Sequence, residues 1–236
     1  MSKLILSLSA ALFLTLSPQA HAASTRPAPR AIGEMASPVT TTRTFNGVTE
    51  GEAYLKNLDP KQRAELEAKG QVLVGEQKQV EKSYAGYIHA IAIFKQPKKR
   101  VYDLMIESDR QVLYLPRITD AKAVDTPPNG MLVEFKLKVV FSKFIYYTRH
   151  WFYPEYSRVE WALDPTYKSD IKLQEGYWQL YEVGPNLTVG EYGTKIDTGV
   201  AVPQFIQDFL ARKDIPKAMT AFRAYMDSNG TFRRDE

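Results

Sequence analysis

The fold of this chain is decided by the stretch 203–228, which reads PQFIQDFLARKDIPKAMTAFRAYMDS. Its apolar side chains recur at helical spacing, which predicts a long helix with one buried face. These apolar positions are Phe205, Ile206, Phe209, Leu210, Ile215, Ala218, Met219, Phe222, Tyr225 and Met226. Pro203 suits a first helical turn, whereas Asp214, two residues before Pro216, is typical of a second N-cap that breaks or kinks the run. Asn229 and Gly230 are typical stop residues.

The region before this helix, 71–198, is mostly β in character. Alternating or continuous apolar runs predict strands at 71–82, 87–94, 118–124, 131–141, 144–153, 158–163, 171–183 and 187–198. Segments 97–105 and 109–115 are expected to be two short helices, and tight turns are expected at 126–130 and 142–143. Because short hairpins join the later strands, the sheet must be antiparallel. The sequence therefore predicts an α+β fold, with a strongly curved sheet wrapped around the final helix.

The N-terminal residues have the pattern of an export signal. Lys3 gives a positive n-region, 4–16 is an apolar h-region, and Ala20, His21 and Ala22 precede the expected cleavage site. We expect a periplasmic or secreted mature protein. An uncleaved membrane anchor is the alternative, but the apolar run is shorter than the roughly 20 residues that span a bilayer.

The domain organisation follows from changes in composition along the chain. Residues 1–22 are the signal peptide, and 23–44, rich in Ala, Ser, Thr and Pro, are expected to form a disordered leader. An N-terminal extension, 45–70, is expected to hold two helices, the second with Asp59 as its N-cap and Gly70 as its stop. The main domain then spans 71–230.

Composition indicates a folded protein, with 44% hydrophobic and 12% aromatic residues and no cysteine. The formal charge of +4 includes Lys3, the only charged residue of the signal, so the mature chain would carry +3. An exported protein is not expected to meet nucleic acid. The densest basic cluster, Lys95, Lys98, Lys99 and Arg100, is either a solvated helix start or a patch for transient contact with an anionic membrane surface.

The order of these elements resembles the helix-grip fold of the START-like superfamily, also called SRPBCC. Local segments between 72 and 228 resemble its motifs: LPRI (115–118), EGYWQL (175–180), TVGEY (188–192), VP (202–203) and IP (215–216). Within the superfamily, the chain looks most like the polyketide cyclase and coenzyme Q-binding branch. The resemblance implies a deep apolar cavity between the sheet and the final helix, and hence a hydrophobic small molecule or lipid as ligand.

Aromatic residues of the elements that would enclose such a cavity are the candidate ligand-binding residues. They are Tyr147, Trp151, Trp178 and Tyr192 from the sheet, Tyr114 from the helix pair, and Phe205, Phe209 and Phe222 from the final helix. Aromatic walls with a few polar groups are typical of small-molecule pockets. For the strand 144–153 a cross-strand aromatic ladder is the alternative, since both of its faces are aromatic and the sequence does not say which one lines the cavity.

Catalysis is possible but not demanded by any motif. A cyclase- or aromatase-like enzyme is the alternative function, in which Arg149, His150, Tyr147 or Glu160 would move protons on a polyketide-type substrate. The few histidines do not form a metal-ligand pattern, and no cofactor fingerprint occurs, so no metal and no cofactor are predicted. A third alternative is a protein-interaction module with a solid interior.

Overall fold

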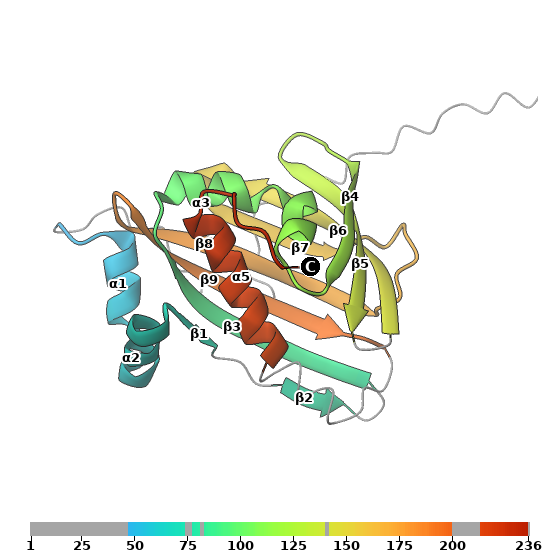
Figure 1. Cartoon of the computed structure of the whole chain (residues 1–236), viewed down its shortest axis with the longest axis horizontal. Helices are drawn as coiled ribbons and strands as arrows, with labels where there is room; N and C mark the ends of the chain where they lie inside the picture. The colour runs from blue at the N-terminus through green and yellow to red at the C-terminus, as the bar shows by residue number, and fades with distance from the viewer. Residues whose placement is uncertain (1–46, 74–76, 81–82, 140–141, 200–212, 236) are drawn as a thin grey trace, which may run out of the picture.

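The computed structural model describes residues 47–73, 77–80, 83–139, 142–199 and 213–235. Its nine strands form one antiparallel sheet in the order β1-β3-β9-β8-β7-β6-β5-β4, with β2 paired to β3 (Figure 1). The strands are β1 (Gln71–Leu73), β2 (Gln77–Val80), β3 (Ser83–Phe94), β4 (Ile118–Asp125), β5 (Gly130–Val139), β6 (Ser142–Tyr153), β7 (Arg158–Leu163), β8 (Leu173–Gly184) and β9 (Leu187–Asp197). The predicted antiparallel α+β architecture is confirmed.

Consecutive strands from β4 to β9 are neighbours, as the hairpin pattern predicts, and β9 then pairs with β3. Two details differ from expectation. The strand expected over 71–82 is described as two, β1 and β2. The tight turn expected at 142–143 is wrong, because Ser142 pairs with Val139 and Lys143 with Lys138, so both residues belong to β6.

The helices are α1 (Glu50–Lys56), α2 (Pro60–Lys69), α3 (Lys98–Met105), the 3-10 helices η1 (Ser108–Leu113) and η2 (Pro154–Tyr156), and α5 (Ile215–Asp227). The expected ends of α2 are confirmed. The Asp59 carboxylate accepts a hydrogen bond from the Lys61 backbone N–H at 2.8 Å, and Gly70 has φ 69°, which closes the helix in the left-handed region. No described helix is long and apolar enough to cross a membrane.

The final helix is described only from residue 213 onward, so the expected kink is not tested. Residues 203–212, and with them Phe205 and Phe209, lie outside the described residues. Asp214 occupies the N-cap position of α5 but its side chain makes no capping hydrogen bond, which corrects the expectation. Its carboxylate instead pairs with both ends of the Arg117 guanidinium, at 2.6 and 2.7 Å.

The C-terminal stop of α5 is confirmed. Asn229 and Gly230 have φ of 59° and 82°, and the Gly230 N–H donates to the Tyr225 carbonyl at 2.8 Å.

Each face of the sheet carries its own apolar cluster. On the concave face, Phe94 and Trp178 pack with Phe222 and Tyr225 of α5. On the convex face, Leu66 of α2 packs with residues of β1, β3, β8 and β9, so α1 and α2 cover this end of the face opposite α5. Two-sided cover explains why the strands are apolar on both faces near β3, β8 and β9.

Candidate functional site

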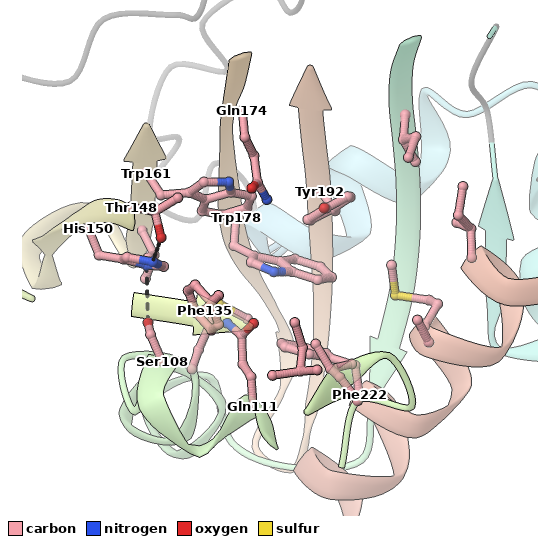
Figure 2. Close-up of a pocket in the computed structure, with 18 of the residues that line it drawn as sticks. Ser108, Gln111, Phe135, Thr148, His150, Trp161, Gln174, Trp178, Tyr192 and Phe222 are labelled. Atoms are coloured by element: carbon pink, nitrogen blue, oxygen red, sulfur yellow. Dashed lines mark hydrogen bonds between the residues drawn. The ribbon is translucent and has the colours of Figure 1, made fainter. Parts of the chain in front are cut away.

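A cavity of about 220 Å³ lies between the concave face of the sheet and a roof made by α5, α3 and η1 (Figure 2). It is partly open to solvent. The sheet contributes Ile88, Phe135, Tyr146, Thr148, His150, Val159, Trp161, Gln174, Trp178 and Tyr192 to its lining, and the segments outside the sheet contribute Met105, Ser108, Gln111, Leu115, Ile215, Ala218, Met219 and Phe222. Ile118, the first residue of β4, completes the lining.

Four aromatic rings form the apolar wall of this cavity. The Trp178 ring stacks on Phe222 of α5, with centroids 4.8 Å apart and an interplanar angle of 11°. Tyr192 lies beside both tryptophans, 4.9 Å from the Trp178 ring and 5.7 Å from the Trp161 ring. Gly176 leaves the room for Trp161, because a Cβ at this position would overlap the indole ring.

The end of the cavity between η1 and β6 is polar (Figure 2). Its centre is His150, whose Nδ1 lies 3.1 Å from the Ser108 hydroxyl and whose Nε2 lies 3.0 Å from the Thr148 hydroxyl. Burial lowers the pKa of His150 to about 3, because the surroundings do not solvate an imidazolium. The ring is therefore neutral at physiological pH, with one nitrogen donating and the other accepting.

Two glutamines add uncharged polar groups to the lining. Figure 2 shows Gln111 reaching in from the roof and Gln174 from the sheet. The Gln174 Oε1 atom is buried and has no hydrogen-bond partner among the described residues. Burial raises the pKa of Tyr192 to about 12, so its hydroxyl also stays neutral. Among the described lining residues none is Asp, Glu, Lys or Arg.

The structure brings three of the predicted ligand-binding residues to the cavity: Trp178, Tyr192 and Phe222. Tyr114 lies behind the lining, where its fully buried ring stacks on Tyr225 at 4.2 Å and contacts Phe222 edge-on at 5.8 Å. It supports the roof without lining the cavity. Contact of these residues with a ligand stays a prediction.

Tyr147 and Trp151 do not line the cavity. Side chains alternate along β6, so the residues that face the cavity are the even-numbered Tyr146, Thr148 and His150. Tyr147 on the opposite face stacks on Tyr167 with centroids 4.6 Å apart and donates a hydrogen bond to Glu134 at 2.5 Å. These contacts do not support the pocket interpretation of this face. Tyr167 lies between β7 and β8, so its stack on Tyr147 is not a cross-strand pair of an aromatic ladder either.

The residues named for catalysis are not gathered in one place. His150 lines the cavity, whereas Arg149, on the other face of β6, pairs with Asp164 at 2.8 Å. Glu160 is fully buried and bonded to Arg158 at 2.9 Å, and does not line the cavity. The proton-transfer set proposed for a cyclase therefore lacks its carboxylate and its cation in the cavity.

The basic cluster at the start of α3 is engaged within the chain. Lys98 lies 3.5 Å from Glu50, Lys99 lies 2.7 Å from Asp103, and the Arg100 guanidinium bonds to Asn229. These contacts match the interpretation of a solvated helix start.

Sequence reasoning named His150 but missed the other polar residues of the lining. Gln174 has the same parity on β8 as Trp178, so the alternation that places Trp178 inside also places Gln174 inside. No sequence pattern predicts that Ser108 lines the cavity, because its hydroxyl reaches His150 only through the tertiary position of η1. The described interior is not solid, which argues against the interaction-module alternative.

No family model matches the sequence, and no curated protein resembles it significantly. Solved structures do share its fold. The Zhui aromatase/cyclase from Streptomyces sp. R1128 is 9% identical with a TM-score of 0.52, over 61% of this chain and 94% of that chain. A START superfamily protein from Mycobacterium smegmatis is 12% identical with a TM-score of 0.51, over 60% of this chain and 97% of its own.

A STAR-related lipid transfer protein from Xanthomonas axonopodis is 11% identical with a TM-score of 0.52, and the alignment covers 67% of this chain and 99% of that fragment. At these identities the likeness concerns the fold and not the activity. The strand order, the helices that roof the cavity and the similar solved structures all indicate the same fold. The chain has the helix-grip fold of the START-like superfamily.

Proposed function

We propose that this protein binds a compact hydrophobic small molecule in the cavity between the sheet and α5. The observation that carries the proposal is the cavity itself: about 220 Å³ of space bordered by Trp161, Trp178, Tyr192 and Phe222. Protein interiors are normally close-packed, and an apolar void of this size forfeits contacts that a ligand restores. Two of the similar structures are an aromatase/cyclase and a lipid transfer protein, which supports an apolar ligand.

The size of the cavity favours a small ligand over a two-chain lipid. Pockets for drug-sized ligands hold roughly 300–1,000 Å³, so the space here suits a molecule at or below the lower end of that range. Burial of its apolar surface would supply the affinity, at roughly 25 cal/mol per Å², less the entropy lost on capture.

Binding without turnover is favoured over catalysis by the state of His150. Its pKa of about 3 makes it a poor general base near neutral pH, and both of its nitrogens already have hydroxyl partners. The ring is better suited to orient a polar group than to move a proton.

The test is native mass spectrometry of the purified protein after exposure to a hydrophobic extract. We expect a bound apolar compound on the wild-type chain. Ala218→Phe, which fills the cavity from the α5 side, should lose it, whereas Lys217→Phe, at an exposed position of the same helix, should retain it. Equal retention by both variants, or a protein that stays apo with every extract, would refute the proposal.

Carriage across an aqueous compartment is the role that such binding would serve in an exported protein. The signal segment 1–22 lies outside the described residues, so export stays a prediction. The protein recovered from a periplasmic fraction should have the intact mass of a chain that begins at Ala23. An uncleaved chain, or a product found only in the cytosol, would contradict the predicted export.

A further inference from the structure

The polar side chains of the cavity divide into groups that already have partners and one that does not. His150, Ser108 and Thr148 satisfy one another. Among the described lining residues, Gln174 Oε1 is the buried side-chain oxygen or nitrogen left without a partner. A buried acceptor without a donor costs about 1–3 kcal/mol, so such atoms call for an occupant that supplies one.

Gln174 has Tyr146, another residue of the lining, as a neighbour. Burial and the nearby Tyr192 hydroxyl raise the pKa of Tyr146, and a hydrogen bond from Gln174 partly offsets this rise. Figure 2 shows this side chain extending toward the tryptophan and tyrosine rings of the wall.

The charge of the cavity sets a second condition on the ligand. No described lining residue carries a formal charge, and His150 is neutral well below physiological pH. A carboxylate, phosphate or ammonium placed here would lose its hydration without gaining a counter-ion, which is strongly unfavourable. The part of the occupant that these residues enclose must therefore be uncharged.

We propose that the ligand is a neutral ring compound carrying an O–H or N–H group that donates a hydrogen bond to Gln174 Oε1. The flat rings of Trp178 and Tyr192 would pack on its apolar body, since aromatic rings favour offset stacking or edge contacts with one another. This inference rests on the proposed function and narrows it: a phenol, an alcohol or an amide fits, whereas a fatty-acid carboxylate and a phospholipid head group do not.

Calorimetric titration of the full chain at pH 7 with three bicyclic probes tests the proposal. 2-Naphthol has the donor, 2-methoxynaphthalene keeps the oxygen but has no donor, and 2-naphthoate is an anion. We expect the wild-type protein to bind 2-naphthol about 3- to 10-fold more tightly than the methyl ether, as one added neutral hydrogen bond allows. 2-Naphthoate should bind most weakly of the three.

Two variants separate hydrogen bonding from shape. Gln174→Leu should bring the preference for 2-naphthol over the ether close to 1 while the ether binds as before. Gln179→Leu, the matched change on the opposite face of the same strand, should leave the preference intact, because Gln179 does not line the cavity. A preference that persists in Gln174→Leu would show that the added methyl group, and not the donor, decides it.

The outcomes distinguish this inference from the function on which it rests. If both neutral probes bind the wild-type protein equally, or if 2-naphthoate binds best, the ligand chemistry proposed here is wrong but the cavity still binds a guest. If no probe binds and native mass spectrometry also finds no ligand, the proposed function itself fails. The comparison of the three probes on the wild-type protein tests the proposal without any variant. A Gln174→Leu protein that folds poorly would therefore not protect the proposal from a negative result.

Discussion

At the scale of single residues, His150 shows how burial decides what a side chain can do. From the sequence, His150 on its aromatic strand was a candidate proton-transfer group. In the structure it is a neutral hydrogen-bonding centre held between Ser108 and Thr148, with its pKa lowered to about 3 by burial. The desolvation that makes this imidazole a poor base also makes the stability of the folded protein depend on pH below the ordinary pKa of histidine.

The His150→Gln variant tests this burial through the pH dependence of stability. The unfolded chain binds a proton at His150 near pH 6.5 and the folded chain only near pH 3, so the wild-type free energy of unfolding falls as pH drops between these values. The loss attributable to this group is at most about 5 kcal/mol, at about 1.4 kcal/mol per unit of pKa. Urea unfolding at intervals from pH 7 to pH 3 should show a shallower decline in His150→Gln.

A matched variant checks that the titrating group is the imidazole. Thr148→Val removes one hydrogen-bond partner but keeps the buried ring, so the slope between pH 6.5 and pH 3 should persist. If His150→Gln and the wild-type protein decline in parallel, the ring is solvated in the folded state and the account of the polar end is wrong.

At the scale of elements, the sequence located nearly every strand and helix of the described chain, because hydrophobic periodicity and turn residues are local signals. The inward face of β6 was also within reach. Paired residues share a face, Phe135 belongs to the apolar face of β5, and its partner is Tyr146. The turn between β5 and β6 was predicted two residues too late in the sequence. A shift of two residues does not change which residues share a face, so the even-numbered residues of β6 face inward with either turn.

The roof of the cavity could not be predicted in the same way. The position of η1 over β6 and of α5 over β3 depends on contacts between distant segments. One such contact is the ion pair of Arg117 with Asp214, whose bond lengths are 2.6 and 2.7 Å. It joins the start of β4 to the start of α5, next to the lining residues Ile118 and Ile215.

Arg117→Leu tests how much this ion pair holds the roof. The substitution leaves a carboxylate that is 8% exposed without its bidentate partner, and the cost should be about 1–3 kcal/mol after allowance for the partial exposure of the arginine. Urea unfolding at pH 7 measures it. Lys136→Ala, which breaks the exposed pair with Asp120, is the control and should change little. Equal losses of unfolding free energy in the two variants would show that the pair of Arg117 with Asp214 contributes no more to stability than an exposed ion pair.

At the scale of the whole molecule, one curved sheet separates two packing layers. α1 and α2 cover the convex face at β1, β3, β8 and β9, and the Glu191 carboxylate of this face is bonded to His89, Tyr177 and Tyr181 at 2.9–3.1 Å. Burial would raise the pKa of Glu191, but these hydrogen bonds and the attraction to His89 lower it. The concave layer, by contrast, keeps a void under α5. The void on the concave side supports the proposal that the ligand binds there.

A structure of the protein soaked with 2-naphthol tests this central claim most directly. The account predicts one probe molecule beneath α5, with its ring against Trp178 and Tyr192 and its hydroxyl within hydrogen-bond distance of Gln174 Oε1. An empty cavity at saturating probe, or a probe bound only on the convex face, would contradict it.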